Sequence, residues 1–232
     1  MVTDYCFDQK QARKNLIRFF KRDKARINSF GKTVNQTFEA HVFAEVIKWY
    51  KKNNWYIELK NPRGKGFSLK FSTQGRPDNY TYCVCQKDGV RCQIRHQLRI
   101  KTKEQPDNDL MSNICCDIAI IHYQDLSQFT TSDAVENADC ISFGEAKHMS
   151  AFAELIAGFV GLVHELKKDN LKKTKKRHVR NKNHLAPFLY VSGILYPTAE
   201  GVKETIMRRN YDIDIYSHEC PMIAKMPVNK RG

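Results

Sequence analysis

The sequence has no apolar run long enough to cross a membrane. A membrane-spanning helix needs about 20 consecutive apolar residues, and no such run occurs among the 232 residues. The first residues also become charged too soon for a secretory signal. We therefore expect an intracellular protein without a membrane partner, either cytoplasmic or, in a eukaryotic or viral host, nuclear.

Signatures of several common catalytic chemistries are missing as well. The chain contains no GxSxG, HExxH or P-loop pattern, and its eight histidines show no metal-ligand spacing. No CxxC pair occurs among the eight cysteines, which fall mostly in strand-like runs, as buried thiols in a reducing compartment do. Cys83, Cys85 and Cys92 nevertheless leave a zinc site as an alternative to buried thiols.

Acidic residues are scarce relative to basic ones. The chain carries 39 Lys and Arg against 25 Asp and Glu, a formal net charge of +14. This excess favours an anionic partner such as nucleic acid or an acidic membrane surface. Nine of the basic residues and only one acidic residue lie at 167–184.

So dense a positive charge resists compact folding and suits contacts with phosphate groups. A solvated loop and a nuclear localisation signal are alternative interpretations of the same segment. The segment directly follows a helix expected at 150–166, which itself follows a strand expected at 138–147, and this place favours a DNA-binding loop. The residues that we expect to bind nucleic acid there are Lys172, Lys173, Lys175, Lys176, Arg177 and Arg180.

The composition of the chain is typical of a globular protein. Apolar residues make up 41% and aromatic residues 11% of the sequence, and a chain of this length can bury a sizeable core. We expect one domain over residues 1–232. Its parts would be a basic helical extension at 1–32, a core at 33–216 that includes the basic loop at 167–184, and a tail at 217–232.

The spacing of apolar residues predicts a mixed α/β fold. Helices are expected at 8–30, 35–52, 150–166 and 198–210. Strands are expected at 55–60, 67–72, 80–86, 90–101, 113–123, 138–147, 186–196 and 211–217. A helix and antiparallel strands thus precede alternating strands and helices, which predicts a mixed sheet with helices on both faces.

The helix expected at 150–166 is apolar around most of its circumference. Its broad face should pack on the sheet and consists of Phe152, Leu155, Phe159, Val163 and Leu166. The opposite face carries small residues, which permit the close approach of a second helix. They are Ala151, Ala157, Gly158 and Gly161, joined by Glu154 and Glu165. We expect an internal contact on this face in preference to a dimer contact.

Two charged residues, Glu145 and Lys147, end the strand expected at 138–147. Because side chains alternate along a strand, both point to the same face. Asp117 lies inside another apolar strand-like run, where an unpaired carboxylate is costly unless it reaches a cation or water. If the two strands are neighbours, Asp117 and Glu145 converge. Two carboxylates and a lysine suffice to hold a divalent cation and to activate water for phosphodiester hydrolysis.

A carboxylate in one strand, Glu-x-Lys in the next and a helix after it resemble the PD-(D/E)XK nuclease superfamily. The resemblance covers roughly residues 35–195 and implies a restriction-endonuclease-like fold. It implies that Asp117, Glu145 and the backbone carbonyl of Ala146 bind Mg²⁺ or Mn²⁺, and that Asp117, Glu145 and Lys147 are catalytic. Lys147 would orient or deprotonate the attacking water and stabilise the developing charge. The products would carry 5′-phosphate and 3′-hydroxyl ends.

Two features depart from the pattern of the superfamily. Cys116 stands where the proline in the superfamily's name would be, a position at which its members are tolerant. The long interval between Asp117 and Glu145 requires a loop insertion between the two strands. Within that interval, Asp133 or Asp139 is an alternative metal ligand.

Two further glutamates are candidates for the site. Glu39 falls on the apolar face of the helix expected at 35–52, and in several branches of the superfamily a glutamate on this helix joins the metal site. A buried salt bridge from Glu39 to Arg or Lys is an equal alternative. Glu154, two turns beyond Lys147, is an auxiliary candidate.

Taken together, these expectations describe a metal-dependent DNA nuclease, most simply an endonuclease of restriction or phage-defence type or from a mobile element. Cutting both strands usually requires two active sites, so we expect a homodimer or a higher homo-oligomer. Three alternatives stay open. They are an RNA nuclease with the same site, a nucleic-acid-binding protein without catalysis, and a basic interaction subunit in which Glu145 and Lys147 form only an ion pair.

Overall fold

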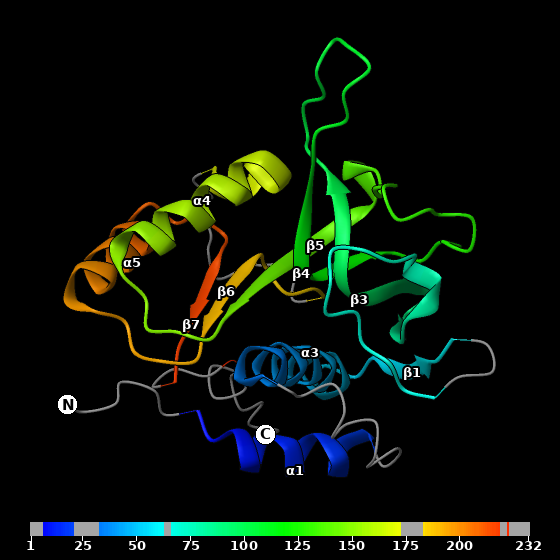
Figure 1. Ribbon diagram of the computed structural model, residues 1–232. Coiled ribbons are helices and arrows are strands. Elements are labelled where there is room, and N and C mark those ends of the chain that lie inside the picture. Colours follow the sequence, from blue (N-terminus) through cyan, green and yellow to red (C-terminus); the bar gives the residue numbers. More distant parts are fainter. Residues whose placement is uncertain (1–6, 21–32, 63–65, 173–182, 219–221, 223–232) are drawn as a thin grey trace.

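The computed structural model describes residues 7–20, 33–62, 66–172, 183–218 and 222, and it has an α/β fold (Figure 1). The helices of the described part are α1 (Gln9–Phe20), α3 (Val34–Lys52), α4 (Ala153–Lys167) and α5 (Pro197–Arg208). The strands are β1 (Tyr56–Lys60), β2 (Tyr82–Lys87), β3 (Val90–Lys101), β4 (Asn113–His122), β5 (Cys140–Lys147), β6 (Phe188–Val191) and β7 (Asp214–Tyr216). Short 3₁₀ turns lie at Pro77–Asn79, Asn137–Asp139 and Lys168–Leu171.

The strands of the described part form one seven-stranded sheet, in the order in which they follow along the chain. Strands β1 to β5 pair antiparallel, whereas β6 joins β5 and β7 joins β6 in parallel. Each parallel connection contains a helix, α4 or α5, because parallel neighbours cannot be joined by a tight turn. The predicted mixed α/β class is therefore confirmed.

Buried apolar side chains form two core clusters. The first core cluster joins α1 and α3 to residues of β2, β3 and β4, and the second joins α4 and α5 to residues of β3, β4, β5 and β6. Large aromatic rings are buried in both, among them Phe38 and Phe43 in the first and Phe143 and Phe159 in the second. Burial of such rings stabilises the fold by roughly 1.5–3 kcal/mol each.

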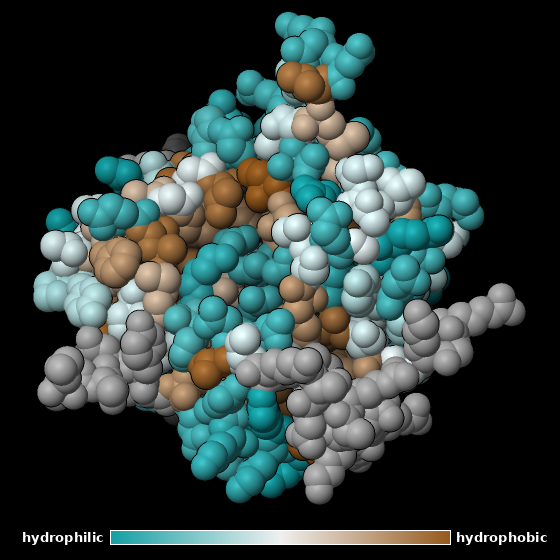
Figure 2. Space-filling model, viewed as in Figure 1, coloured by the Kyte–Doolittle hydropathy of each residue, from teal (hydrophilic) through white to brown (hydrophobic). Residues whose placement is uncertain are grey.

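Helix α3 begins at a cap formed by Thr33, whose side-chain oxygen accepts the N–H of Gln36 at 3.2 Å. Helix α1 buries only one side, through Ala12, Leu16 and Phe20, and Figure 2 shows a hydrophilic surface over it. The helix predicted at 8–30 is confirmed as far as residue 20. Its remainder, 21–32, lies outside the described residues.

In strand β3, the side of the sheet on which alternate side chains lie changes at a single residue. Ile94 belongs to the first core cluster, but Leu98, four residues further on, belongs to the second. In a regular strand these two side chains would share a face, because the side-chain period is two. Gln97 lies between them with a positive φ of 53°, a conformation that non-glycine residues rarely adopt.

Strand β4 exchanges faces at the matching position. Ile118 belongs to the first core cluster and Cys116 to the second, although in a regular strand they would share a face. Their partners in β3 are His96 and Leu98, so Asp117 lies opposite Gln97 at the point of exchange. The carboxylate predicted to be functional therefore lies at a bend of the sheet.

The segment at 66–72 is irregular, which contradicts the predicted strand at 67–72. Phe67 and Leu69 are buried, and this alternation of apolar residues produced the strand-like pattern. Ser68 is held instead by Thr81, through a side-chain hydrogen bond of 2.8 Å and a backbone hydrogen bond of 2.7 Å. The alternation of apolar residues at 67–72 therefore reflects the burial of Phe67 and Leu69 in a segment that does not pair with the sheet.

Most of the small-residue face of α4 is exposed within the described part of the chain, so the predicted internal contact is wrong there, although Ala151, just before the helix, is buried. Ala157, Gly158 and Gly161 are exposed, and a Cβ added at either glycine would meet no atom within 4 Å. The broad face that was expected to pack on the sheet does so through Phe159, Val163 and Leu166, which are buried in the second core cluster, whereas Phe152 is 43% exposed. Figure 2 shows an apolar surface along this side of α4.

Among the described residues, no helix combines the length and the apolar character that spanning a membrane would need.

Candidate active site

Asp117 lies where β4 and β5 stop pairing. The register between these strands ends at Ile118 and Gly144. Beyond that pair, Asp117 Oδ2 accepts the backbone N–H of Ala146 at 3.0 Å, so the carboxylate takes the place of a backbone acceptor. The residue is only 7% exposed. The prediction that the two strands are neighbours in the sheet is confirmed, because β4 pairs with β5. The long interval between Asp117 and Glu145 is accounted for by the connection at 123–139.

Glu145 and Lys147 project from the end of β5 beside Asp117. The ammonium of Lys147 lies 2.8 Å from Glu145 Oε2 and 2.9 Å from Asp117 Oδ2. Ala146, between them, contributes to the first core cluster, as alternation along the strand requires. The two carboxylates thus converge on one positive charge.

A second Glu-x-Lys sequence shows that the motif alone does not make such a site. Glu58 and Lys60 form an ion pair on strand β1 at an outer edge of the sheet, where both side chains are more than 40% exposed. The residue opposite Glu58 in β2 is Val84, so no carboxylate faces the pair from the neighbouring strand. Only the Glu145–Lys147 pair meets a carboxylate from an adjacent strand.

The electrostatics of the site reflect crowded negative charge. Burial, with a further contribution from the charge of Asp117, raises the pKa of Glu145 to about 7. Burial acts to lower the pKa of Lys147, but the charges of Glu145 and Asp117 outweigh it and raise that pKa above its usual value. An additional cation beside the carboxylates would relieve the cost of burying them.

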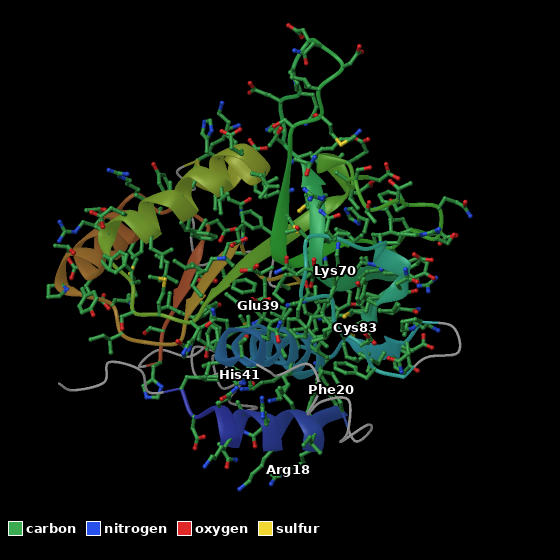
Figure 3. The ribbon with its side chains drawn as sticks, viewed as in Figure 1. Arg18, Phe20, Glu39, His41, Lys70 and Cys83 are labelled. Carbon is green, nitrogen blue, oxygen red and sulfur yellow. The ribbon has the colours of Figure 1, made fainter. Side chains whose placement is uncertain are left out.

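Gln97 links Asp117 to the helix below the sheet. Its side-chain Nε2 donates to Asp117 Oδ1 at 2.9 Å and to Glu39 Oε2 at 3.3 Å. Glu39, on α3, also lies 3.2 Å from His96 Nε2. Glu39, labelled in Figure 3, and Asp117 therefore share the amide of Gln97. The ionisable neighbour of Glu39 is a histidine and not the Arg or Lys of the alternative prediction.

The donor set suits a hard divalent cation. Magnesium needs only one or two protein carboxylates and retains several waters, and Asp117 and Glu145 meet that need. The carbonyl of Ala146 turns to the same strand edge as its N–H, toward Asp117, because both groups of one residue face the same neighbour. Within the described residues, no three His, Cys, Asp or Glu side chains are grouped so as to hold a metal by themselves.

The other predicted acidic residues lie apart from this centre. Asp133 accepts the N–H of Thr130 at 2.7 Å in its own loop, and Asp139 precedes β5 at the end opposite Glu145. Glu154 is exposed in the first turn of α4. Asp117 therefore remains the carboxylate that faces Glu145.

Of the predicted nucleic-acid-binding residues, only Lys172 lies in the described part of the chain. It is exposed and forms an ion pair of 2.6 Å with Asp169. Lys173, Lys175, Lys176, Arg177 and Arg180 lie outside the described residues.

The three cysteines of the alternative zinc site are fully buried in β2 and β3. The sulfur atoms of Cys83 and Cys85 are 3.9 Å apart, and Cys92 is the register partner of Cys85. Hydrogen bonding to Cys83 raises the pKa of the Cys85 thiol. These residues pack in the first core cluster.

Sequence reasoning missed Gln97 and His96. The only signal for them was a group of polar residues inside the strand-like run at 90–101, which also contains Arg and Lys. Gln97 lies opposite Asp117 in the antiparallel register of β3 and β4, so its contact with Asp117 depends on a strand pairing that the local sequence pattern does not determine. Comparison with models of protein families, with curated proteins and with solved structures yields no match to this chain.

Proposed function

We propose that this protein is a Mg²⁺- or Mn²⁺-dependent nuclease that hydrolyses phosphodiester bonds of DNA, with a site of the PD-(D/E)XK type. One observation carries the proposal. Asp117 and Glu145, from adjacent strands, both contact the ammonium of Lys147, at 2.9 Å and 2.8 Å. Two carboxylates that converge on one position from adjacent strands can hold the divalent cation that such hydrolysis uses.

In this proposal, the divalent ion would be held by Asp117, Glu145 and the carbonyl of Ala146. Glu39 is a further candidate ligand, because the amide of Gln97 donates hydrogen bonds to both Glu39 and Asp117. When bound there, a divalent ion would supply Lewis-acid stabilisation of the phosphoryl oxygens and would lower the pKa of water. Lys147, whose raised pKa keeps it an ammonium, would orient the attacking water and stabilise the negative charge that develops on the phosphoryl oxygens. The products carry 5′-phosphate and 3′-hydroxyl ends.

The proposal includes a restriction-endonuclease-like arrangement with helices on both faces of the sheet. A single site cuts one strand, so double-strand cleavage calls for a homodimer or a higher homo-oligomer. The net charge of +14 supports a polyanionic substrate. An endonuclease of restriction, phage-defence or mobile-element type fits these features.

The test is incubation of plasmid DNA, and separately of RNA, with Mg²⁺, Mn²⁺ or EDTA. We expect nicking or linearisation with either metal and none with EDTA. The variants Glu145→Ala and Lys147→Ala should lose at least about a hundredfold in rate, as the removal of an electrostatic catalytic group does. RNA cleavage by the same residues would favour the RNA nuclease alternative.

The matched controls are Glu58→Ala and Lys60→Ala. They remove the same residue types, at the same spacing, from the exposed edge strand β1. Both controls should cleave at the wild-type rate. The catalytic proposal is overturned if wild type and Glu145→Ala behave alike, and a protein that binds DNA without cutting it would fit the non-catalytic alternative.

A further inference from the structure

Two positively charged side chains, Lys70 and Arg99, have no ion pair with a described carboxylate. Their charges act on the thiol of Cys115, as do those of Asp117 and Glu145, so Cys115 lies within electrostatic range of all four groups. Lys70 is only 3% exposed, and within the described residues no hydrogen bond or ion pair reaches its ammonium group. Arg99 donates from Nη1 to Asn113 Oδ1 at 3.0 Å, but its buried Nε has no hydrogen-bond partner in the same part of the chain. Neither cation is neutralised by a described carboxylate.

The backbone fixes Lys70 beside the face exchange of β3. Its carbonyl accepts a hydrogen bond from Nδ1 of His96, the residue before Gln97. The neighbouring ring of Phe71 packs edge-on against His96, with centroids 5.0 Å apart. Figure 3 shows Lys70 on the same side of α3 as Glu39. The irregular segment at 66–72 is thus tied to the strand that supports the site.

Arg99 is joined to the same centre through the β3–β4 pairing. Its register partner is Cys115, whose thiol donates to Gln97 Oε1 at 3.5 Å. The amide nitrogen of Gln97 in turn holds Asp117. A short chain of contacts therefore leads from Arg99 to the candidate metal ligands.

The energetics call for an anion at this position. Burial lowers the pKa of Lys70, the nearby thiol of Cys115 acts against that shift, and the like charge of Arg99 adds to it. A buried charge without a partner is costly, and two like charges close together increase that cost. A phosphate oxygen placed between them would give both cations strong charge-assisted hydrogen bonds.

We propose that Lys70 and Arg99 bind one backbone phosphate of the nucleic acid, next to the phosphodiester that is cleaved. The proposal rests on the proposed function of the Asp117–Glu145 site, because that site defines which phosphodiester is cleaved. Lys70 and Arg99 position the strand and take no part in proton transfer. The proposed phosphate site uses residues of the irregular segment at 66–72 and of β3, and none of the basic residues at 167–184.

Binding of a short fluorescein-labelled DNA duplex to the full chain, followed by fluorescence anisotropy in EDTA, tests the site without cleavage. Lys70→Met and Arg99→Gln should each weaken binding about tenfold or more, and each should reduce the slope of log K against log salt by about one. Lys70→Arg keeps the charge and should restore most of the affinity. Lys87→Gln and Arg91→Gln, on the hairpin end of β2 and β3, are the controls.

Stability separates this role from a structural one. Lys70→Met removes a buried unpaired charge, so its melting temperature in EDTA should equal or exceed that of wild type. The proposal fails if Lys70→Met and Arg99→Gln keep the affinity and the salt slope of the two controls. It also fails if Lys70→Arg binds no better than Lys70→Met.

The two proposals fail in different ways. If Lys70→Met loses binding but the wild-type protein cleaves nothing with Mg²⁺ or Mn²⁺, the phosphate site is supported and the nuclease proposal is contradicted. Conversely, if cleavage requires Glu145 and yet proceeds in Lys70→Met with unchanged kcat and KM, the nuclease proposal is supported and the phosphate site is contradicted.

Discussion

Asp117 Oδ2 accepts the backbone N–H of Ala146 at 3.0 Å, across the gap that opens where β4 and β5 stop pairing. The carboxylate therefore closes the sheet at the same place where we propose that it binds a cation. Because a buried N–H without an acceptor is costly, the fold itself favours a side-chain acceptor at this position.

Asp117→Asn and Asp117→Ala should separate these two tasks. Asparagine keeps an oxygen for the N–H of Ala146, so its unfolding free energy should stay within about 1 kcal/mol of wild type, whereas alanine should cost roughly 1–3 kcal/mol. Both should lose at least about a hundredfold in metal-dependent cleavage. Urea denaturation in EDTA and the plasmid assay measure the two effects. Wild-type cleavage by Asp117→Asn would contradict the assignment.

The charge of Glu145 should destabilise the metal-free protein at high pH. Its pKa is raised to about 7 from a usual 4.5, so the folded state binds the proton more tightly than the unfolded state. The associated stability is present below about pH 4.5 and is lost as the pH rises to 7 and above. Glu145→Gln, which cannot ionise, should be more stable than wild type at pH 8 by on the order of 1–3 kcal/mol.

Urea denaturation in EDTA at pH 8 and pH 5 measures this difference, which should be small at the lower pH. Glu58→Gln, which makes the same substitution on the exposed edge strand, is the control. An equal difference between wild type and Glu145→Gln at both pH values would show that its charge is not the cause.

The sequence predicted the elements of the sheet better than the contacts between them. Turn residues and runs of β-forming apolar residues located the strands at 90–101 and 113–123 almost to the residue. Alternation also placed Glu145 and Lys147 on one face. The convergence with Asp117 was conditional on strand pairing, which a local pattern does not determine.

The missed features share a physical cause. A positive φ at Gln97 reverses the faces of β3, and no local propensity marks a glutamine for that conformation. Lys70 lies in a segment whose alternation reflects burial without strand pairing. For α4, periodicity showed which residues share the small face, but it could not show whether another element covers them.

The absence of a side chain at Gly144 should be essential to the end of β5. A Cβ at this residue would overlap the ring of Phe188, its register partner in β6, which is fully buried. Gly144→Ala should destabilise the protein by roughly 1–3 kcal/mol, as overpacking of a core does. Phe188→Leu makes room, so the double variant should lose less stability than the two single changes combined.

Gly158→Ala is the matched control for Gly144→Ala. A Cβ at Gly158 meets nothing within 4 Å on the exposed side of α4, so alanine should stabilise this helix by about 1 kcal/mol. Urea denaturation measures both changes. If Gly144→Ala unfolds at the wild-type midpoint, the close approach of Phe188 is not a constraint on β5.

Gln97 should serve the site through both its backbone and its amide, and two substitutions distinguish these roles. Its φ of 53° costs roughly 1–2 kcal/mol for a residue with a side chain, and glycine avoids that cost. Gln97→Gly should therefore be more stable than Gln97→Ala by about that amount. Both variants lose the donor that Asp117 Oδ1 and Glu39 Oε2 share.

Without that donor the two carboxylates are no longer held in place, so the Mg²⁺ concentration at half-maximal cleavage should rise about tenfold or more in both variants. Gln86→Ala, an exposed glutamine of β2, should leave it unchanged. A metal titration of the cleavage rate gives this value independently of stability. If Gln97→Gly keeps the wild-type requirement for Mg²⁺, Gln97 shapes only the bend of the sheet, and the orientation of Asp117 comes from Ala146 and Lys147 alone.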